Sequence, residues 1–188
     1  MYHIPPIPTW DALHPLVIHF PIVLLLLSPV FIFLGALLKE PIGGSYRIAG
    51  LILLLLGTIS LFVATSTGEA AADLADRGGG VNAVLSAHEN MAGYTRMFFA
   101  GLSAILLGMV LLPKLLKHEE TRFSTTFMHM AFLILYSVGI LFLVNTAHAG
   151  GRLVHEYGVH ALLPADNSSA ADAGSKSPVT SAEMDEQP

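Results

Sequence analysis

The chain has 188 residues, of which 53% are hydrophobic and only 12% charged, and its formal net charge is −5. Soluble globular proteins carry about 25% charged residues, so this composition and a mean hydropathy of +0.64 favour a protein that lives in a lipid bilayer. The nine Lys and Arg residues form no basic stripe, which argues against a nucleic-acid partner. The absence of cysteine excludes disulfides, iron–sulfur clusters and covalently attached c-type haem.

Four long uncharged stretches predict four membrane-spanning helices. They cover residues 16–38, 48–68, 97–113 and 123–151. A hydrocarbon core about 30 Å thick needs about 20 helical residues, so three of the stretches are long enough to span it outright. The third also spans it if Arg96 lies at an interface. The segment before the first stretch has no basic region, and no small-residue cleavage site follows, so we expect that stretch to stay in the protein as a helix.

The predicted fold is an all-α, integral membrane four-helix bundle. We expect helices over about residues 10–38, 46–67, 86–113 and 123–149, within a transmembrane domain that covers residues 1–163. Pro21 and Pro29 should bend the first helix. Residues 164–188 are mostly Ala, Ser, Asp and Glu, which predicts a disordered acidic tail. No internal repeat is evident in the sequence.

The basic residues predict how the bundle is oriented. They gather in the first and third connections between helices, at Lys39, Arg47, Lys114, Lys117 and Arg122. Cytoplasmic loops of membrane proteins are enriched in Lys and Arg, so both connections should face the cytoplasm. The N-terminus, the C-terminus and the 69–87 connection should then be extracytoplasmic.

Histidines gather at the extracytoplasmic ends of the predicted helices. Counting about 1.5 Å per residue from the cytoplasmic anchors places His19 near the outer hydrocarbon boundary and His14 about 7 Å higher. The same count places His88 and His148 roughly 8 Å above that boundary, and His155 follows beyond. A single interfacial histidine is more often solvated than a ligand. Several at one depth on separate helices indicate a cofactor or metal site, since ionisable groups inside bundles tend to be functional.

Arg96 is a further candidate, because it lies inside the third helix, two turns below His88. A charged side chain at that position needs a partner, or else it extends along the helix to reach the interface. The candidate partners are the propionates of a porphyrin and three carboxylates near the same end of the bundle, namely Glu69, Asp73 and Glu89.

Gly150 and Gly151 follow His148 almost directly. Two interpretations are open for this pair. Glycine can end a helix through a left-handed residue. It can also let a flat ligand approach the backbone closely, because it has no Cβ.

Two segments resemble a bacterial family of four-helix inner-membrane proteins of unknown function. Residues 14–21 read HPLVIHFP, similar to the family's opening motif HPLxVHFP, and residues 147–155 read AHAGGRLVH, similar to its GHxGGxLTHG branch. The resemblance covers about residues 12–160 and includes His88-Glu89. One departure is that Tyr157 stands where the family commonly has a histidine before Gly-Val. The resemblance implies a bacterial inner membrane, in which the extracytoplasmic termini would be periplasmic. It also implies an electron-transfer setting, because members of this branch are often fused to, or encoded beside, c-type cytochromes.

We expect a haem-b-binding electron-transfer subunit with its histidine-rich site at the periplasmic surface, as part of a respiratory or similar complex. One or two haems would take axial imidazoles from facing helices. The leading ligand candidates are His19, the deepest, and His148, which carries the Gly-Gly pair, followed by His88 and His14. A c-type cytochrome or a quinone would exchange electrons with the site.

Two alternatives stay open. Imidazoles together with nearby carboxylates also suit zinc, copper or iron, with the same four histidines as ligands. A cofactor-free structural subunit of a membrane complex is the second alternative. No Ser/His/Asp arrangement or phosphate-binding loop argues for an independent enzyme.

Overall fold

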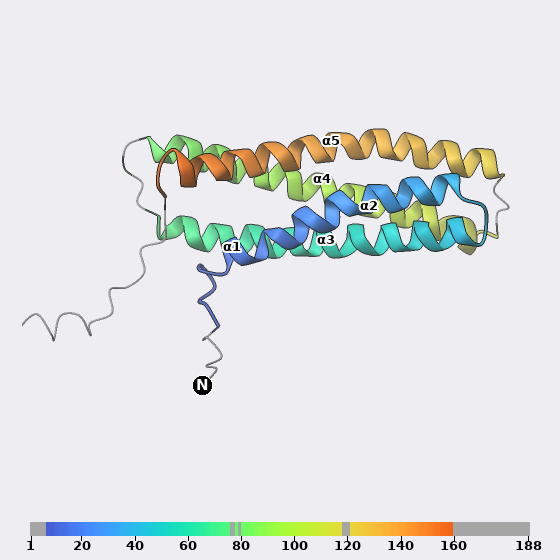
Figure 1. The fold of residues 1–188 in the computed structure, drawn as a ribbon, viewed down its shortest axis with the longest axis horizontal. Coiled ribbons are helices and arrows are strands. Elements are labelled where there is room, and N and C mark those ends of the chain that lie inside the picture. Colours follow the sequence, from blue (N-terminus) through green and yellow to red (C-terminus); the bar gives the residue numbers. More distant parts are fainter. Residues whose placement is uncertain (1–6, 76–77, 79, 118–120, 160–188) are drawn as a thin grey trace, which may run out of the picture.

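A computed structural model describes residues 7–75, 78, 80–117 and 121–159 and shows an all-helical bundle (Figure 1). The helices are α1 (His14–Val17), α2 (His19–Leu37), α3 (Ile42–Asp73), α4 (Val81–Leu115) and α5 (Arg122–His155). With α1 and α2 taken together, the described residues contain four helices long and apolar enough to cross a membrane. The predicted all-α membrane bundle is confirmed at this level, while the 164–188 tail lies outside the described residues.

Three helices extend further than predicted at the histidine end, on the left of Figure 1. α3 continues to Asp73, α4 already begins at Val81 and α5 continues to His155. A small apolar cluster holds these extensions together, formed by Ala72, Val81, Leu85 and Leu153. The predicted boundaries stopped at polar and glycine-rich segments, whereas tertiary packing keeps those segments helical. The interpretation of Gly150–Gly151 as a helix end is therefore wrong.

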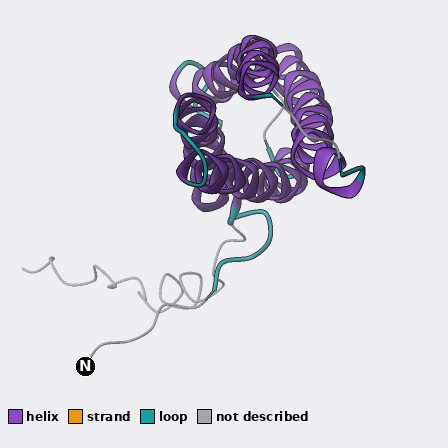
Figure 2. Cartoon of the chain, turned by 90° about the vertical axis from the view of Figure 1, so that its right-hand side faces the viewer, coloured by secondary structure: helices purple, strands orange, loops and turns teal. Residues whose placement is uncertain are grey.

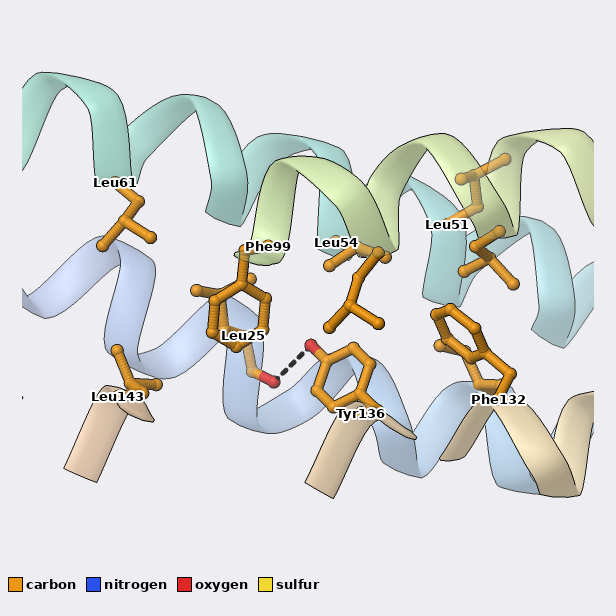
Figure 3. Close-up of a cluster of buried hydrophobic side chains, with 11 residues drawn as sticks. Leu25, Leu51, Leu54, Leu61, Phe99, Phe132, Tyr136 and Leu143 are labelled. Atoms are coloured by element: carbon orange, nitrogen blue, oxygen red, sulfur yellow. Dashed lines mark hydrogen bonds between the residues drawn. The ribbon is translucent and has the colours of Figure 1, made fainter. Parts of the chain in front are cut away.

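The two prolines of the first span act differently. Pro21 has no N–H to bond the carbonyl of Val17, and the helix is interrupted at Ile18, directly after that residue. Pro29 stays inside α2 and leaves the carbonyl of Leu25 without its usual helical donor. The buried Tyr136 hydroxyl of α5 donates to that carbonyl instead, at 2.7 Å (Figure 3).

The spans form a ring, which Figure 2 shows end-on, and the contacts between helices give the order α2, α3, α4, α5. Consecutive helices contact one another, α5 closes the ring against α2, and consecutive helices run antiparallel. The core between them is apolar and includes Leu25, Leu54 and Phe99, each 0% exposed. Large apolar side chains also cover the outer surface, such as Ile134, which is 73% exposed. Contact with lipid explains that surface, because apolar side chains are compatible with hydrocarbon. The helices suit the same solvent, because their backbone polar groups bond within each helix.

Candidate histidine site

His14 opens α1, and its ring packs against α3. Its Nδ1 lies 2.9 Å from the carbonyl oxygen of Ala64 and 3.2 Å from Oγ1 of Thr67. A carbonyl only accepts hydrogen bonds, so Nδ1 carries the proton and donates it, and Nε2 keeps its lone pair. Gly68, one turn beyond Ala64, makes room for the ring, since a Cβ there would lie 2.8 Å from Cε1 of His14.

His88 has the same environment in the other half of the bundle. Its Nδ1 donates to the carbonyl oxygen of Thr146 on α5, at 3.0 Å. A Cβ on Gly150, one turn later, would lie 3.0 Å from Cε1 of His88. The hydroxyl of Thr146 pairs with that of the buried Thr95 at 2.8 Å, which fixes α4 against α5 at this level. The space left by Gly150 thus holds the His88 ring, while Gly151 has open space where a Cβ would be.

His14 and His88 lie at the same end of the bundle, and both side chains are half-buried, His14 against α3 and His88 against α5. Among the described residues neither Nε2 has a hydrogen-bond partner. Histidines that ligate metals commonly hold Nδ1–H against a carbonyl in this way, which fixes the tautomer and the ring orientation.

The other candidate histidines, His19, His148 and His155, differ from this pair in having exposed side chains. Depth counting did not consider which side of the helix each of them occupies. His19 is five residues after His14, about 140° around a helix axis, so the two cannot share a face. No group of three or more His, Asp or Glu side chains suited to a metal ion occurs in the described parts of the chain.

Arg96 reaches from α4 across to α3. Its guanidinium donates to Oγ1 of the buried Thr65 at 3.2 Å and lies 5.3 Å from the centre of the Phe62 ring. Glu69, one of the expected partners, is 4.0 Å away and mostly exposed, so this ion pair is weak. The Nε of Arg96 is buried and has no hydrogen-bond partner within the described residues. Arg96 therefore keeps donor capacity for an anionic group.

Sequence reasoning missed the residues that hold the two rings. Ala64 and Thr146 act through backbone carbonyls, for which side-chain chemistry gives no signal. The glycines gave a partial signal, because each of Gly68 and Gly150 stands four residues after one of these acceptors. Without knowing which helix faces which, that spacing could not be assigned to a partner.

The fold defines an integral four-helix membrane protein, with two half-buried histidines near one end of the bundle. Residues 10–162 match the family model described as "Predicted membrane protein (DUF2231)", and the chain belongs to that family. The resemblance to an uncharacterised membrane family is thereby confirmed. Comparison with curated proteins and with solved structures gives no match.

Proposed function

We propose that this protein is a haem-b-binding electron-transfer subunit of a bacterial inner membrane, with His14 and His88 as the axial ligands. The observation that carries the proposal is the pair of half-buried imidazoles at one end of the bundle, each with Nδ1–H held by a backbone carbonyl and Nε2 without a hydrogen-bond partner among the described residues. Neutral imidazoles from facing helices are the usual axial ligands in electron-transfer bundles. The haem would supply the one-electron chemistry.

The number of ligands favours haem over a bare metal ion. A porphyrin already provides four nitrogen ligands, so two imidazoles complete a six-coordinate iron. Zinc bound by the protein takes three or four protein ligands. Two histidines of the described residues have their rings oriented in this way, and no group of three or more His, Asp or Glu suited to a metal ion occurs there. A metal-only site remains the second candidate, and it would need a further ligand.

The chain's own residues have distinct roles in this proposal. The carbonyls of Ala64 and Thr146 orient the two rings and, by accepting the Nδ1 protons, make each Nε2 a better electron donor. Arg96 lies two turns from His88 and would offer guanidinium N–H groups to the propionates. His19 and His148 become exposed neighbours of the site instead of leading ligands.

The proposed site faces the periplasm. At the opposite end of the bundle, Arg47 donates to the carbonyl of Gly35 and pairs with Glu40, and Arg122 donates to the carbonyl of Leu37 at 3.0 Å. These arginines bond to the end of α2 at the end of the bundle that the positive-inside rule assigns to the cytoplasm. A c-type cytochrome or a quinone is the proposed redox partner at the periplasmic end, within a respiratory or similar complex.

A haem assay on detergent-purified protein tests the proposal. We expect a pyridine haemochrome spectrum of haem b in the wild-type protein, and a reduced haem content in His14→Ala and in His88→Ala. Since His19→Ala and His148→Ala alter exposed side chains near the same end of the bundle, they serve as matched controls and should keep the wild-type content. Full haem content in both His14→Ala and His88→Ala would overturn the ligand assignment, and a wild-type protein without haem would overturn the function.

A further inference from the structure

The two halves of the bundle share a set of contacts at the histidine level, although Thr67, which also contacts the His14 ring, corresponds to Ala149 in the other half. In each half a histidine near the start of a span bonds to a backbone carbonyl of the next span and lies over a glycine four residues beyond that carbonyl. The equivalent sets are His14 with Ala64 and Gly68, and His88 with Thr146 and Gly150.

The equivalence continues toward the middle of the bundle. A large apolar residue stands eleven residues after each histidine, and it packs over a glycine of the next span. That glycine stands seven residues before the residue whose carbonyl accepts from the histidine. A Cβ on Gly57 would lie 2.7 Å from Cδ2 of Leu25, and a Cβ on Gly139 would lie 3.1 Å from Cζ of Phe99. Other buried positions coincide in the same register, namely Pro21 with Thr95, Ser28 with Leu102, Ile32 with Leu106, Leu54 with Tyr136, and Leu61 with Leu143.

Helical periodicity alone does not account for this match. Any two amphipathic helices repeat their buried positions about every 3.6 residues. Periodicity does not explain why two pairs of helices have equivalent contacts between their helices at two successive depths. It also does not explain why each pair has a histidine at the same level. The ring order fits as well, because exchanging α2 with α4 and α3 with α5 leaves every contacting pair of helices in contact.

We infer that the chain is a tandem repeat of one helical hairpin, and that its two copies form a single ligand site on their common two-fold axis. The repeats are α1–α3 and α4–α5, and the axis runs along the bundle, as in membrane proteins built from parallel repeats. His14 and His88 are then equivalent ligands of one centre, so the chain holds one haem at this level. The identity of the ligand rests on the proposed function, whereas the repeat does not.

Arg96 departs from the repeat and gives the site a direction. It lies eight residues after His88, and the equivalent position after His14 is Ile22. Thr65, which accepts from Arg96, corresponds to Ala147 in the other hairpin. The cation therefore lies on one side of an otherwise two-fold site, at the α3–α4 interface, where it selects the orientation of a ligand with one anionic edge.

Moving the cation to its equivalent position tests the inference. The readout is the rate at which haem transfers from the purified protein to apomyoglobin. Arg96→Ile should speed transfer about tenfold through loss of a charge-assisted hydrogen bond. Adding Ile22→Arg and Ala147→Thr rebuilds the pair at the equivalent α2–α5 interface and should restore the rate to within about threefold. The matched control replaces Ile22→Arg with Val23→Arg, an exposed neighbour, and should not rescue.

A second measurement tests the repeat without haem. In apoprotein, Gly68→Ala and Gly150→Ala each push a Cβ against a histidine ring and should lower Tm by similar amounts. Gly101→Ala, where the described structure leaves the Cβ position open, should not lower it. Absence of rescue by the relocated arginine, two haems per chain, or a loss of Tm in only one glycine variant would each overturn the inference. If the two glycine variants lose similar Tm but the wild-type protein binds no haem, the repeat is supported and the proposed function is refuted.

Discussion

Tyr136 compensates for a hydrogen bond that Pro29 removes from α2, and this compensation can be measured. The Tyr136 hydroxyl donates to the buried carbonyl of Leu25 at 2.7 Å, the group that a non-proline residue at position 29 would bond. Tyr136→Phe leaves that carbonyl without a donor, at a cost of about 1–2 kcal/mol in the free energy of unfolding. In a Pro29→Ala background the new N–H of residue 29 reaches the same carbonyl, so the cost should fall below about 0.5 kcal/mol.

The assay is reversible unfolding by SDS titration in mixed micelles, applied to the wild type, the two single variants and the double variant. The coupling free energy of this double-mutant cycle should be about 1 kcal/mol. Ser137→Ala is the matched control, because that exposed hydroxyl bonds only to Ile134 of its own helix among the described residues, and it should change stability little. Equal losses from Tyr136→Phe in both backgrounds would refute the reasoning.

Two further predictions concern the ends of the bundle. For topology, cysteines at Ser45 or Lys117 should be shielded from impermeant thiol reagents in intact cells and one at Thr9 should label; labelling at Lys117→Cys alone would reverse the orientation. For pH dependence, the hydrogen bond from Arg47 holds the pKa of Glu40 below its usual value, so the ion pair stabilises the fold at neutral pH and is lost as the pH falls through that lowered pKa. Glu40→Gln should therefore be less stable than wild type at pH 7, with the gap closing below about pH 4, and an unchanged gap would argue against the pair.

The membrane fold could be predicted from the sequence because a bilayer imposes a strong and simple pattern. Four apolar stretches of sufficient length gave four spans, and their number is confirmed. Their ends were harder to place. The extensions to Asp73 and His155 depend on the small apolar cluster around Leu153. No local helix propensity reveals that packing.

Approximate depths of the candidate histidines can be counted from the sequence, but not which rings pack against a neighbouring helix. Counting along the helices gives such depths for His14, His88, His19 and His148. It could not show which rings face the interior, because that depends on helix rotation and on partners such as the Ala64 carbonyl. The internal repeat was not evident because equivalent positions differ in residue type, as Leu54 and Tyr136 do, and share only contacts.

Electron paramagnetic resonance of the oxidised, haem-loaded protein tests the central claim most directly, because it reports the axial ligands of the iron. The account predicts a low-spin ferric signal with two imidazole ligands in the wild type, and a high-spin signal in the residual haem of both His14→Ala and His88→Ala. A low-spin signal that survives in both variants, or one that is lost in His19→Ala or His148→Ala instead, would contradict it.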